Sequence, residues 1–259
     1  MASLRELALP PLLQPHAVEK AQLTLAIDLS VQVGADLAIA KPDGIPGSPA
    51  LPALVSFNRI KQYPLDTLKG RAALLHAITH IELNAIDLAL DIVWRFADMP
   101  EAFYIEWITI AKEEAKHFLL LREHLVSLGF DYGDFDAHNA LWDMAERTSG
   151  DLLARIALVP RTLEARGLDA SPAVRNKLIS VGDQRAGEIL AIILHDEIGH
   201  VACGNRWYRY LCQQRGLDPV AYYAELTVQY DAPVLRPPFN LDARRKAGFE
   251  QAELDALLR

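Results

Sequence analysis

Cysteine and positive charge are both scarce in this 259-residue chain. The two cysteines, Cys203 and Cys212, lie nine positions apart on one expected helix. That spacing is a rise of about 13 Å, too long for a disulfide between them. Basic residues number 26 against 34 acidic ones, for a formal net charge of -8. Because nucleic-acid binders present clustered Lys and Arg to the phosphates, nucleic acid is not an expected partner.

Long uncharged hydrophobic runs are also missing. The most apolar stretches are interrupted by His80 and Glu82, or by Asp196 and Glu197. None reaches the roughly 18 residues that a membrane span needs. The first ten residues lead into no apolar segment with a small-residue cleavage site, so we expect no secretory signal. The expected location is the cytoplasm, without a membrane partner.

The chain also lacks the alternation of apolar and polar residues that is typical of strands, and we therefore predict an all-α fold. Apolar residues instead recur at three and four positions, the spacing of a helix. Gly129, Gly167 and Gly216 are expected to end the last three long helices, and Pro160 to kink the third. The four long helices are predicted at about 66–96, 101–128, 151–166 and 183–215.

We expect one domain over residues 1–259. Its core, 66–216, would be a four-helix bundle. An N-terminal extension, 1–65, would carry a helix near 16–33 and a loop at 41–52, where four Pro and two Gly forbid regular structure. The C-terminal extension, 217–259, would add further short helices.

Acidic residues lie at the centre of the apolar faces of these helices, and histidines lie at the edge of two of those faces. Two of the helices carry the same Glu-x-x-His motif at the same phase, and two more carry a single glutamate. Gly167 is expected to place the glutamate of the third helix in its last turn, so Glu146 is the alternative there. The six candidate ligands are Glu82, Glu114, His117, Glu164, Glu197 and His200.

Four carboxylates in one core cannot all stay ionised unless positive charge lies among them. Two divalent cations would bring +4 against their -4. Four helices that supply Glu, Glu-x-x-His, Glu and Glu-x-x-His form the ligand set of di-iron and di-manganese bundles. Iron is the first expectation, manganese the second, and zinc is less favoured because it prefers four ligands, often with sulfur. Three further side chains are predicted either to orient these ligands or to form salt bridges between helices: Asn84, Asp87 and Arg161.

A ferritin-like bundle has parallel second and third helices, which requires a long crossover between them. From Glu114 to Glu164 the chain must return along roughly 40 Å. The 22 residues 129–150 are enough for that connection. The prediction is therefore a ferritin-like four-helix bundle with a long crossover between helices 2 and 3.

Several segments also resemble a known family. They are RAALLHAITHIELNAIDLALDIVWRF (71–96), AKEEAKHFLLLRE (111–123), VPRTLEARGLD (159–169) and HDEIGHVACGN (195–205). Together with 237–240 they resemble a bacterial family of ferritin-like proteins of unassigned function, and more distantly the ferritin-like di-iron tRNA hydroxylases. The resemblance implies a four-helix bundle with a dinuclear site on the same six residues. It names no substrate.

Two functions remain open at this point. One is an oxidoreductase in which a metal pair activates O2 or peroxide on a small organic substrate, with an external electron donor. The other is a ferroxidase-type protein that oxidises or stores iron and has no organic substrate. The extensions at the two ends of the bundle could wall off a substrate pocket, which favours the enzyme. A metal-free helical scaffold is the plainest alternative. The sequence assigns no catalytic residue, and a homodimer is the candidate assembly.

Overall fold

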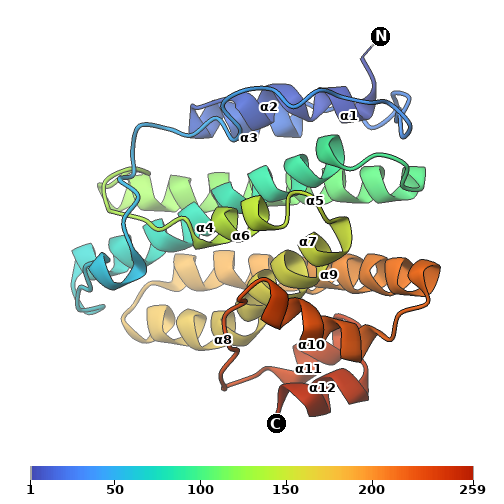
Figure 1. The fold of residues 1–259 in the computed structure, drawn as a ribbon. Helices are drawn as coiled ribbons and strands as arrows, with labels where there is room; N and C mark the ends of the chain where they lie inside the picture. Colours follow the sequence, from blue (N-terminus) through green and yellow to red (C-terminus); the bar gives the residue numbers. More distant parts are fainter. Residues whose placement is uncertain (1, 259) are drawn as a thin grey trace. The chain divides into compact units, whose positions relative to one another are not determined.

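The structure, a computed structural model, describes residues 2–258. Regular structure in this range is helical (Figure 1). One isolated β-bridge pairs Leu54 with Ala137. The predicted all-α helical fold is confirmed.

The chain divides into two compact units, 1–142 with 181–189 and 143–180 with 190–259. Helices α6 and α9 each begin in the first unit and continue in the second. The first unit holds α1 (Leu4–Leu7), α2 (Leu9–Leu13), α3 (Ala17–Leu25), η1 (Phe57–Arg59), α4 (Leu68–Arg95) and α5 (Glu101–Ser127). The remaining elements are α6 (Ala140–Arg147), α7 (Leu152–Leu158), η2 (Val159–Glu164), α8 (Ala165–Ser180), α9 (Gln184–Arg215), α10 (Pro219–Gln229), α11 (Leu241–Lys246) and α12 (Gln251–Leu257).

Helices α4 and α5 are an antiparallel pair within the first unit (Figure 1). Thr67 caps α4 by accepting a hydrogen bond from the Gly70 N–H at 3.0 Å. Five residues, 96–100, join the two helices, and Asp98 takes a left-handed conformation there with φ 62°. Both helices lie within two residues of their predicted bounds, because their apolar periodicity and end signals agree.

The N-terminal segment is bound to this pair by buried cations. The Arg5 guanidinium donates from Nε to the Val93 carbonyl at 3.0 Å and from Nη2 to the Trp94 carbonyl at 2.7 Å. It thereby satisfies carbonyl groups that the end of α4 leaves without helical partners. Lys20 of α3 forms a buried ion pair with Asp87 of α4. These contacts make the predicted extension part of the first unit's core.

The predicted helix near 16–33 is shorter than expected. Helix α3 ends at Leu25, and the Asp28 side chain then accepts a hydrogen bond from the Ser30 N–H at 2.9 Å, which favours a turn. The proline-rich stretch 41–52 contains no helix or strand, as predicted.

The third long helix corrects the prediction at Gly167. The chain passes from α7 through one π-helical stretch, η2, into α8, and it continues past Gly167 to Ser180. Gly167 is not among the glycines with positive φ, whereas Gly216, with φ 64°, ends α9 as expected. Pro160 lacks an N–H, and the wider π turn accommodates it where a kink was expected. Glu164 therefore lies inside a continuous helical run rather than in a last turn.

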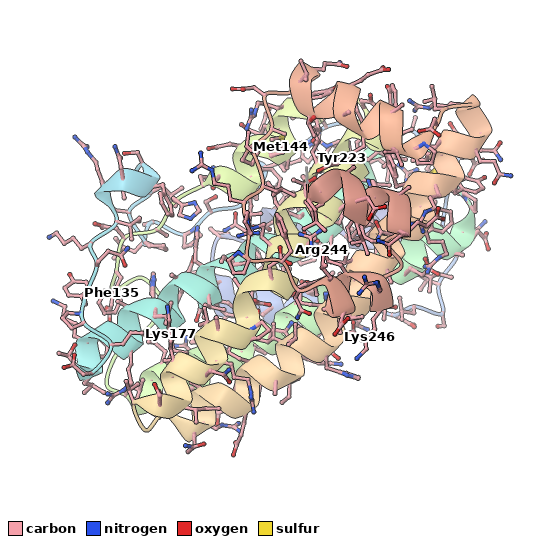
Figure 2. All side chains as sticks on the ribbon, turned by 90° about the horizontal axis from the view of Figure 1, so that it is seen from below. Phe135, Met144, Lys177, Tyr223, Arg244 and Lys246 are labelled. Atoms are coloured by element: carbon pink, nitrogen blue, oxygen red, sulfur yellow. The ribbon has the colours of Figure 1, made fainter. Side chains whose placement is uncertain are left out.

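The second unit is held together by small apolar residues shared between helices. Ala165 and Leu168 of α8, Val201 of α9, Ala243 of α11 and Ala247, the C-cap of α11, form one buried cluster. Gly204 of α9 lets η2 approach closely, because a Cβ there would lie 3.0 Å from Pro160 Cβ. Arg244 of α11, labelled in Figure 2, donates two hydrogen bonds to the Asp169 carboxylate of α8, from Nε at 3.0 Å and from Nη2 at 2.7 Å.

Helix α4 is the one described helix that is long and apolar enough to cross a membrane. Its most apolar window is 72% buried by the rest of the chain, as in the core helix of a soluble protein. Cys203 and Cys212 are buried free thiols, which agrees with the predicted absence of a disulfide between them.

A buried histidine of α4 makes the first unit sensitive to acid. His76 is fully buried and stacks on Tyr132, with ring centroids 5.2 Å apart. Its Nε2 accepts a hydrogen bond from the Gly133 N–H at 2.9 Å. Burial lowers the pKa of His76 from 6.5 to about 4. The unfolded chain therefore takes up this proton first as the pH falls, and stability is lost from about pH 6.5 downward.

We predict that His76→Gln flattens this acid loss, because an amide oxygen can still accept from Gly133. Between pH 8 and pH 5 the free energy of unfolding of the wild type should fall by about 2 kcal/mol more than that of the variant. Urea denaturation at several pH values measures the difference, and the pH 8 values remove any constant offset. Parallel pH profiles would contradict the prediction.

Candidate metal centre

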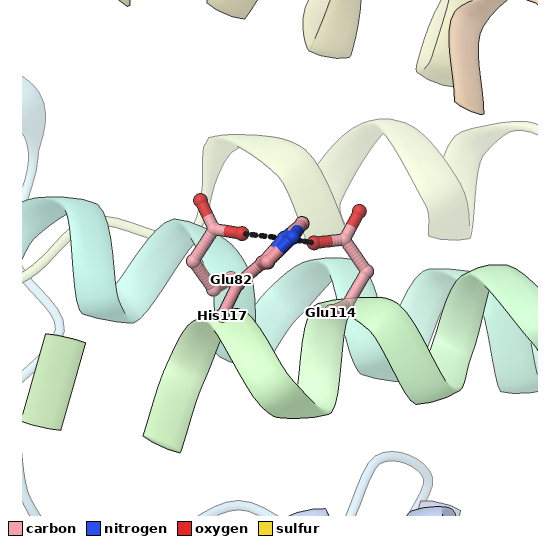
Figure 3. A group of neighbouring side chains, drawn as sticks. All are labelled: Glu82, Glu114 and His117. Carbon is pink, nitrogen blue, oxygen red and sulfur yellow. Dashed lines mark hydrogen bonds and ion pairs between the residues drawn. The ribbon is translucent and has the colours of Figure 1, made fainter. Parts of the chain in front are cut away.

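Three buried ionisable side chains converge between α4 and α5. His117 Nδ1 lies 3.2 Å from Glu82 Oε2 and 3.2 Å from Glu114 Oε2 (Figure 3). The three residues are 3%, 1% and 1% exposed for Glu82, Glu114 and His117. One ligand atom from each lies within 4.8 Å of the others, which is close enough for all three to hold one metal ion.

The helices create this cluster directly. Glu114 and His117 are three positions apart and therefore share one face of α5. The antiparallel pairing with α4 sets Glu82 opposite that face. Fully buried apolar residues lie one or two turns away on the same faces, among them Ile86, Phe118 and Leu121. The three charges are thus surrounded by apolar side chains, as the amphipathic pattern predicts.

Protons neutralise much of this cluster without a metal. Burial, followed by the charge of Glu114, raises the pKa of Glu82 well above its usual range. Burial lowers the pKa of His117, but its hydrogen bonds to Glu114 and Glu82 raise it to about 11 overall. Carboxylate and imidazole ligands must lose such protons to bind a cation. The donor set, two oxygens and one imidazole, suits a divalent first-row metal.

The second Glu-x-x-His motif lies on α9, in the second unit. Its residues are buried, with Glu197 9% and His200 2% exposed. His200 Nδ1 lies 3.8 Å from Glu197 Oε1. This repeats the side-by-side arrangement of Glu114 and His117, since both pairs are three positions apart on a helix.

Glu164 is the last residue of η2 and is partly exposed. The alternative for the third helix, Glu146, is exposed on α6, where water would solvate its charge. Glu164 is therefore the better candidate of the two. The placing of Glu164, Glu197 and His200 in one centre with the α4–α5 cluster stays a prediction.

The three residues expected to support the ligands have well-defined contacts. Asn84 donates from Nδ2 to the His80 carbonyl at 2.8 Å. Asp87 is paired with Lys20, and burial raises its pKa to about 6 although Lys20 lowers it. Arg161 donates from Nε to Asn205 Oδ1 at 2.5 Å and pairs with Glu253. Their role in orienting metal ligands stays a prediction; the ion pairs of Asp87 and Arg161 follow the salt-bridge alternative.

Comparison with known proteins places the chain in a family. The family model described as "Protein of unknown function (DUF455)" matches residues 13–255. The chain belongs to the DUF455 family. An uncharacterized protein of Haemophilus influenzae (strain ATCC 51907 / DSM 11121 / KW20 / Rd) is 47% identical to it over 224 residues. The match covers 84% of this chain and 78% of that protein. No solved structure matches the chain.

Membership of a family of unassigned function is thus confirmed, and the ferritin-like relation of this DUF455 protein stays a prediction. Sequence reasoning had identified all three residues of the α4–α5 cluster. It had not foreseen the π-helical stretch beside Glu164, for which Pro160 within an otherwise helical pattern was the available signal.

We predict opposite effects for two substitutions in the α4–α5 cluster. Glu82→Gln removes a buried ionisable group with little change in shape, so the metal-free protein should keep its stability or gain up to about 2 kcal/mol. His117→Leu leaves two buried carboxyl groups without their cation and should cost about 3–5 kcal/mol. Chemical denaturation in the presence of a chelator measures both.

With metal bound, we expect the wild type to be more stable than Glu82→Gln, the reverse of the order in the metal-free proteins. A hundredfold excess of Mn(II) over its Kd should stabilise the wild type by about 2.7 kcal/mol and the variant by much less. The exposed Glu188→Gln on α9 serves as a control and should behave as the wild type. Equal Mn(II) stabilisation of wild type and Glu82→Gln would show that this cluster binds no metal.

Proposed function

We propose that this DUF455 protein is a dinuclear metal carboxylate protein, with iron as the metal, and that it activates O2 or peroxide to oxidise a small organic molecule. The observation that supports this most strongly is the buried Glu82–Glu114–His117 cluster, in which a Glu-x-x-His motif faces a further glutamate. The chain contains a second buried Glu-x-x-His motif, Glu197 with His200.

The proposal assigns six residues to the metal pair. Glu82, Glu114 and His117 would hold one side of the centre, and Glu197 and His200 the other, with Glu164 as the sixth ligand. Four carboxylates balance the charge of two divalent ions. The free-energy cost of burying the carboxylates is offset when both ions are bound. A mixed oxygen and imidazole set without thiolate favours iron, then manganese, over zinc.

The chemistry divides between the metal pair and the chain. When bound, the ions supply the electrons that reduce O2 or peroxide. With O2, insertion of one oxygen atom into a substrate leaves the other to form water, which requires two electrons and two protons from an external donor. With peroxide, no such donor is needed. The apolar residues that flank the α4–α5 cluster exclude bulk water from the centre.

The segments outside the long helices favour an enzyme over an iron store. The N-terminal segment is bound firmly to α4 through Arg5 and Lys20. The C-terminal segment packs on α8 and α9 through α11. A storage subunit needs little beyond its bundle, whereas a substrate enzyme needs walls around a pocket.

Metal loading tests the dinuclear assignment. We predict that anaerobic Fe(II) titration of the chelated protein saturates at two ions per chain. Glu197→Gln should lower this to one or less, because it removes a carboxylate from the proposed second half of the centre. Glu188→Gln, an exposed change on the same helix, should leave two ions bound. Iron quantified after desalting gives the stoichiometry, and no retained iron in the wild type would favour a metal-free scaffold.

Reaction with O2 then separates the two functional classes. Either enzyme, an oxidase or an oxygenase, should consume O2 in proportion to its two irons. An oxygenase should turn over further only with an electron donor and an organic substrate, and an oxidase only with the organic substrate, which itself supplies the electrons. Continued uptake of iron far above two ions per chain, with O2 consumed in step, would overturn the enzyme proposal in favour of a ferroxidase or store.

A further inference from the structure

The second unit contains a pocket of about 650 Å³ beside α10, the segment 231–235 and α12. This volume is in the range of small-molecule sites. Two valines at the pocket, Val228 and Val234, are each 82% exposed. The wall is largely aliphatic, with Val220, Ala224, Val228, Val234, Leu235 and Leu257 among its residues.

One buried guanidinium gives the pocket a polar end. Arg161 lines it and is 3% exposed. Tyr208, Tyr223 and Phe249 surround this guanidinium, with ring centroids 4.1, 5.3 and 5.2 Å from its Cζ. Nε is bound to Asn205 and Nη2 to Glu253. Nη1 is buried and has no hydrogen-bond partner within the described residues. Because buried polar groups are almost always hydrogen-bonded, we expect a ligand to supply the acceptor for Nη1.

The charges around this end favour an anion. Glu253 is shared by two guanidiniums, those of Arg161 and Arg209, the second at 2.7 Å. Arg244, which also lines the pocket, is neutralised by Asp169. Two exposed carboxylates lie nearby, and water screens both charges. Glu250 approaches Arg209 to 3.4 Å with its side chain 70% exposed, and Asp231 lines the pocket at an exposed position. One buried carboxylate therefore faces two cations.

We propose that this pocket binds an amphipathic monocarboxylate with an aliphatic chain. The carboxylate would accept hydrogen bonds from Arg161 Nη1, and the chain would lie along the aliphatic wall formed by α10 and the 231–235 segment. A single negative charge matches the excess of one guanidinium, whereas a phosphate dianion would need further donors. A neutral ligand would leave the excess charge unmatched.

This inference does not depend on the metal centre, because every residue that it uses lies in the second unit and no metal takes part. Arg161 and Glu164 do belong to the same π-helical stretch, η2. A ligand held by Arg161 would thus lie against the element that supplies one proposed metal ligand.

Calorimetric titration of the full-length protein, kept metal-free with a chelator, tests the ligand class. The probes are decanoate, decanol and decyltrimethylammonium, each below its micellar concentration. Decanoate should bind one per chain and at least tenfold more tightly than decanol, and the cation should bind more weakly than decanol. Equal affinity for decanoate and decanol would overturn the proposal, because the Arg161 guanidinium would then make no favourable contact with the carboxylate.

Two tryptophan substitutions on α10 locate the binding site. Ala224→Trp fills the pocket and should weaken decanoate binding at least tenfold. Gln229→Trp, on an exposed position about 140° around the helix that does not line the pocket, should bind as the wild type. Unchanged binding in Ala224→Trp would exclude this pocket.

Substitution of the guanidinium tests the head-group contact. Arg161→Gln should retain decanol binding and lose the preference for decanoate. Because Arg161 is buried among aromatic rings, folding is checked by circular dichroism, and Arg161→Lys is the second variant if the first does not fold. A preference for decanoate that survives in a folded Arg161→Gln would overturn the role of Arg161.

Discussion

The neutralisation of buried charge is the constraint on which this structure depends. Glu82, Glu114 and His117 lie in the apolar interface of α4 and α5, where ionised groups are costly without partners of opposite charge. Protons can meet this requirement, and the raised pKa values of Glu82 and His117 show where they are held. A divalent cation would meet it better, since it replaces two positive charges by one compact ion that all three ligands can contact. The same requirement applies to Glu197 and His200 on α9.

Among the Arg and Lys side chains that the structure describes, Arg161 is the one with a buried nitrogen that has no hydrogen-bond partner. Arg5 donates hydrogen bonds to the carbonyls at the end of α4. Lys20 forms an ion pair with Asp87, and Arg244 forms one with Asp169. These contacts replace water with fixed acceptors and join segments that are distant in sequence. Arg161 is equally buried but has one nitrogen without an acceptor, at the edge of an aliphatic pocket. That difference is why the pocket, rather than another charged cluster, points to a ligand.

The π-helical stretch η2 connects the two proposals. It places Arg161 toward the pocket of the second unit and ends at Glu164, the least buried of the proposed metal ligands. Wide turns of this kind occur often at functional sites, because they shift the side-chain register of one helix face against the other. Pro160 removes the backbone donor that a regular turn would need, and Gly204 leaves room for the proline ring. The same local irregularity thus positions Arg161, at the proposed ligand pocket, and Glu164, a proposed metal ligand.

The sequence by itself determined the features that repeat along one helix. The bounds of α4 and α5, the end of α9 at Gly216, and the Glu-x-x-His motifs within apolar faces all follow from periodicity and local conformation. Glu82, Glu114 and His117 could be named in advance for that reason. The tertiary structure decided what depends on neighbours distant in the chain. Gly167 did not end its helix because Ala165 and Leu168 are held in a buried cluster with α9 and α11. The partners of Asp87 and Arg161 lie 44 to 92 residues away in the chain, and the pocket beside α10 also includes the distant Arg161. No local pattern encodes contacts of this kind.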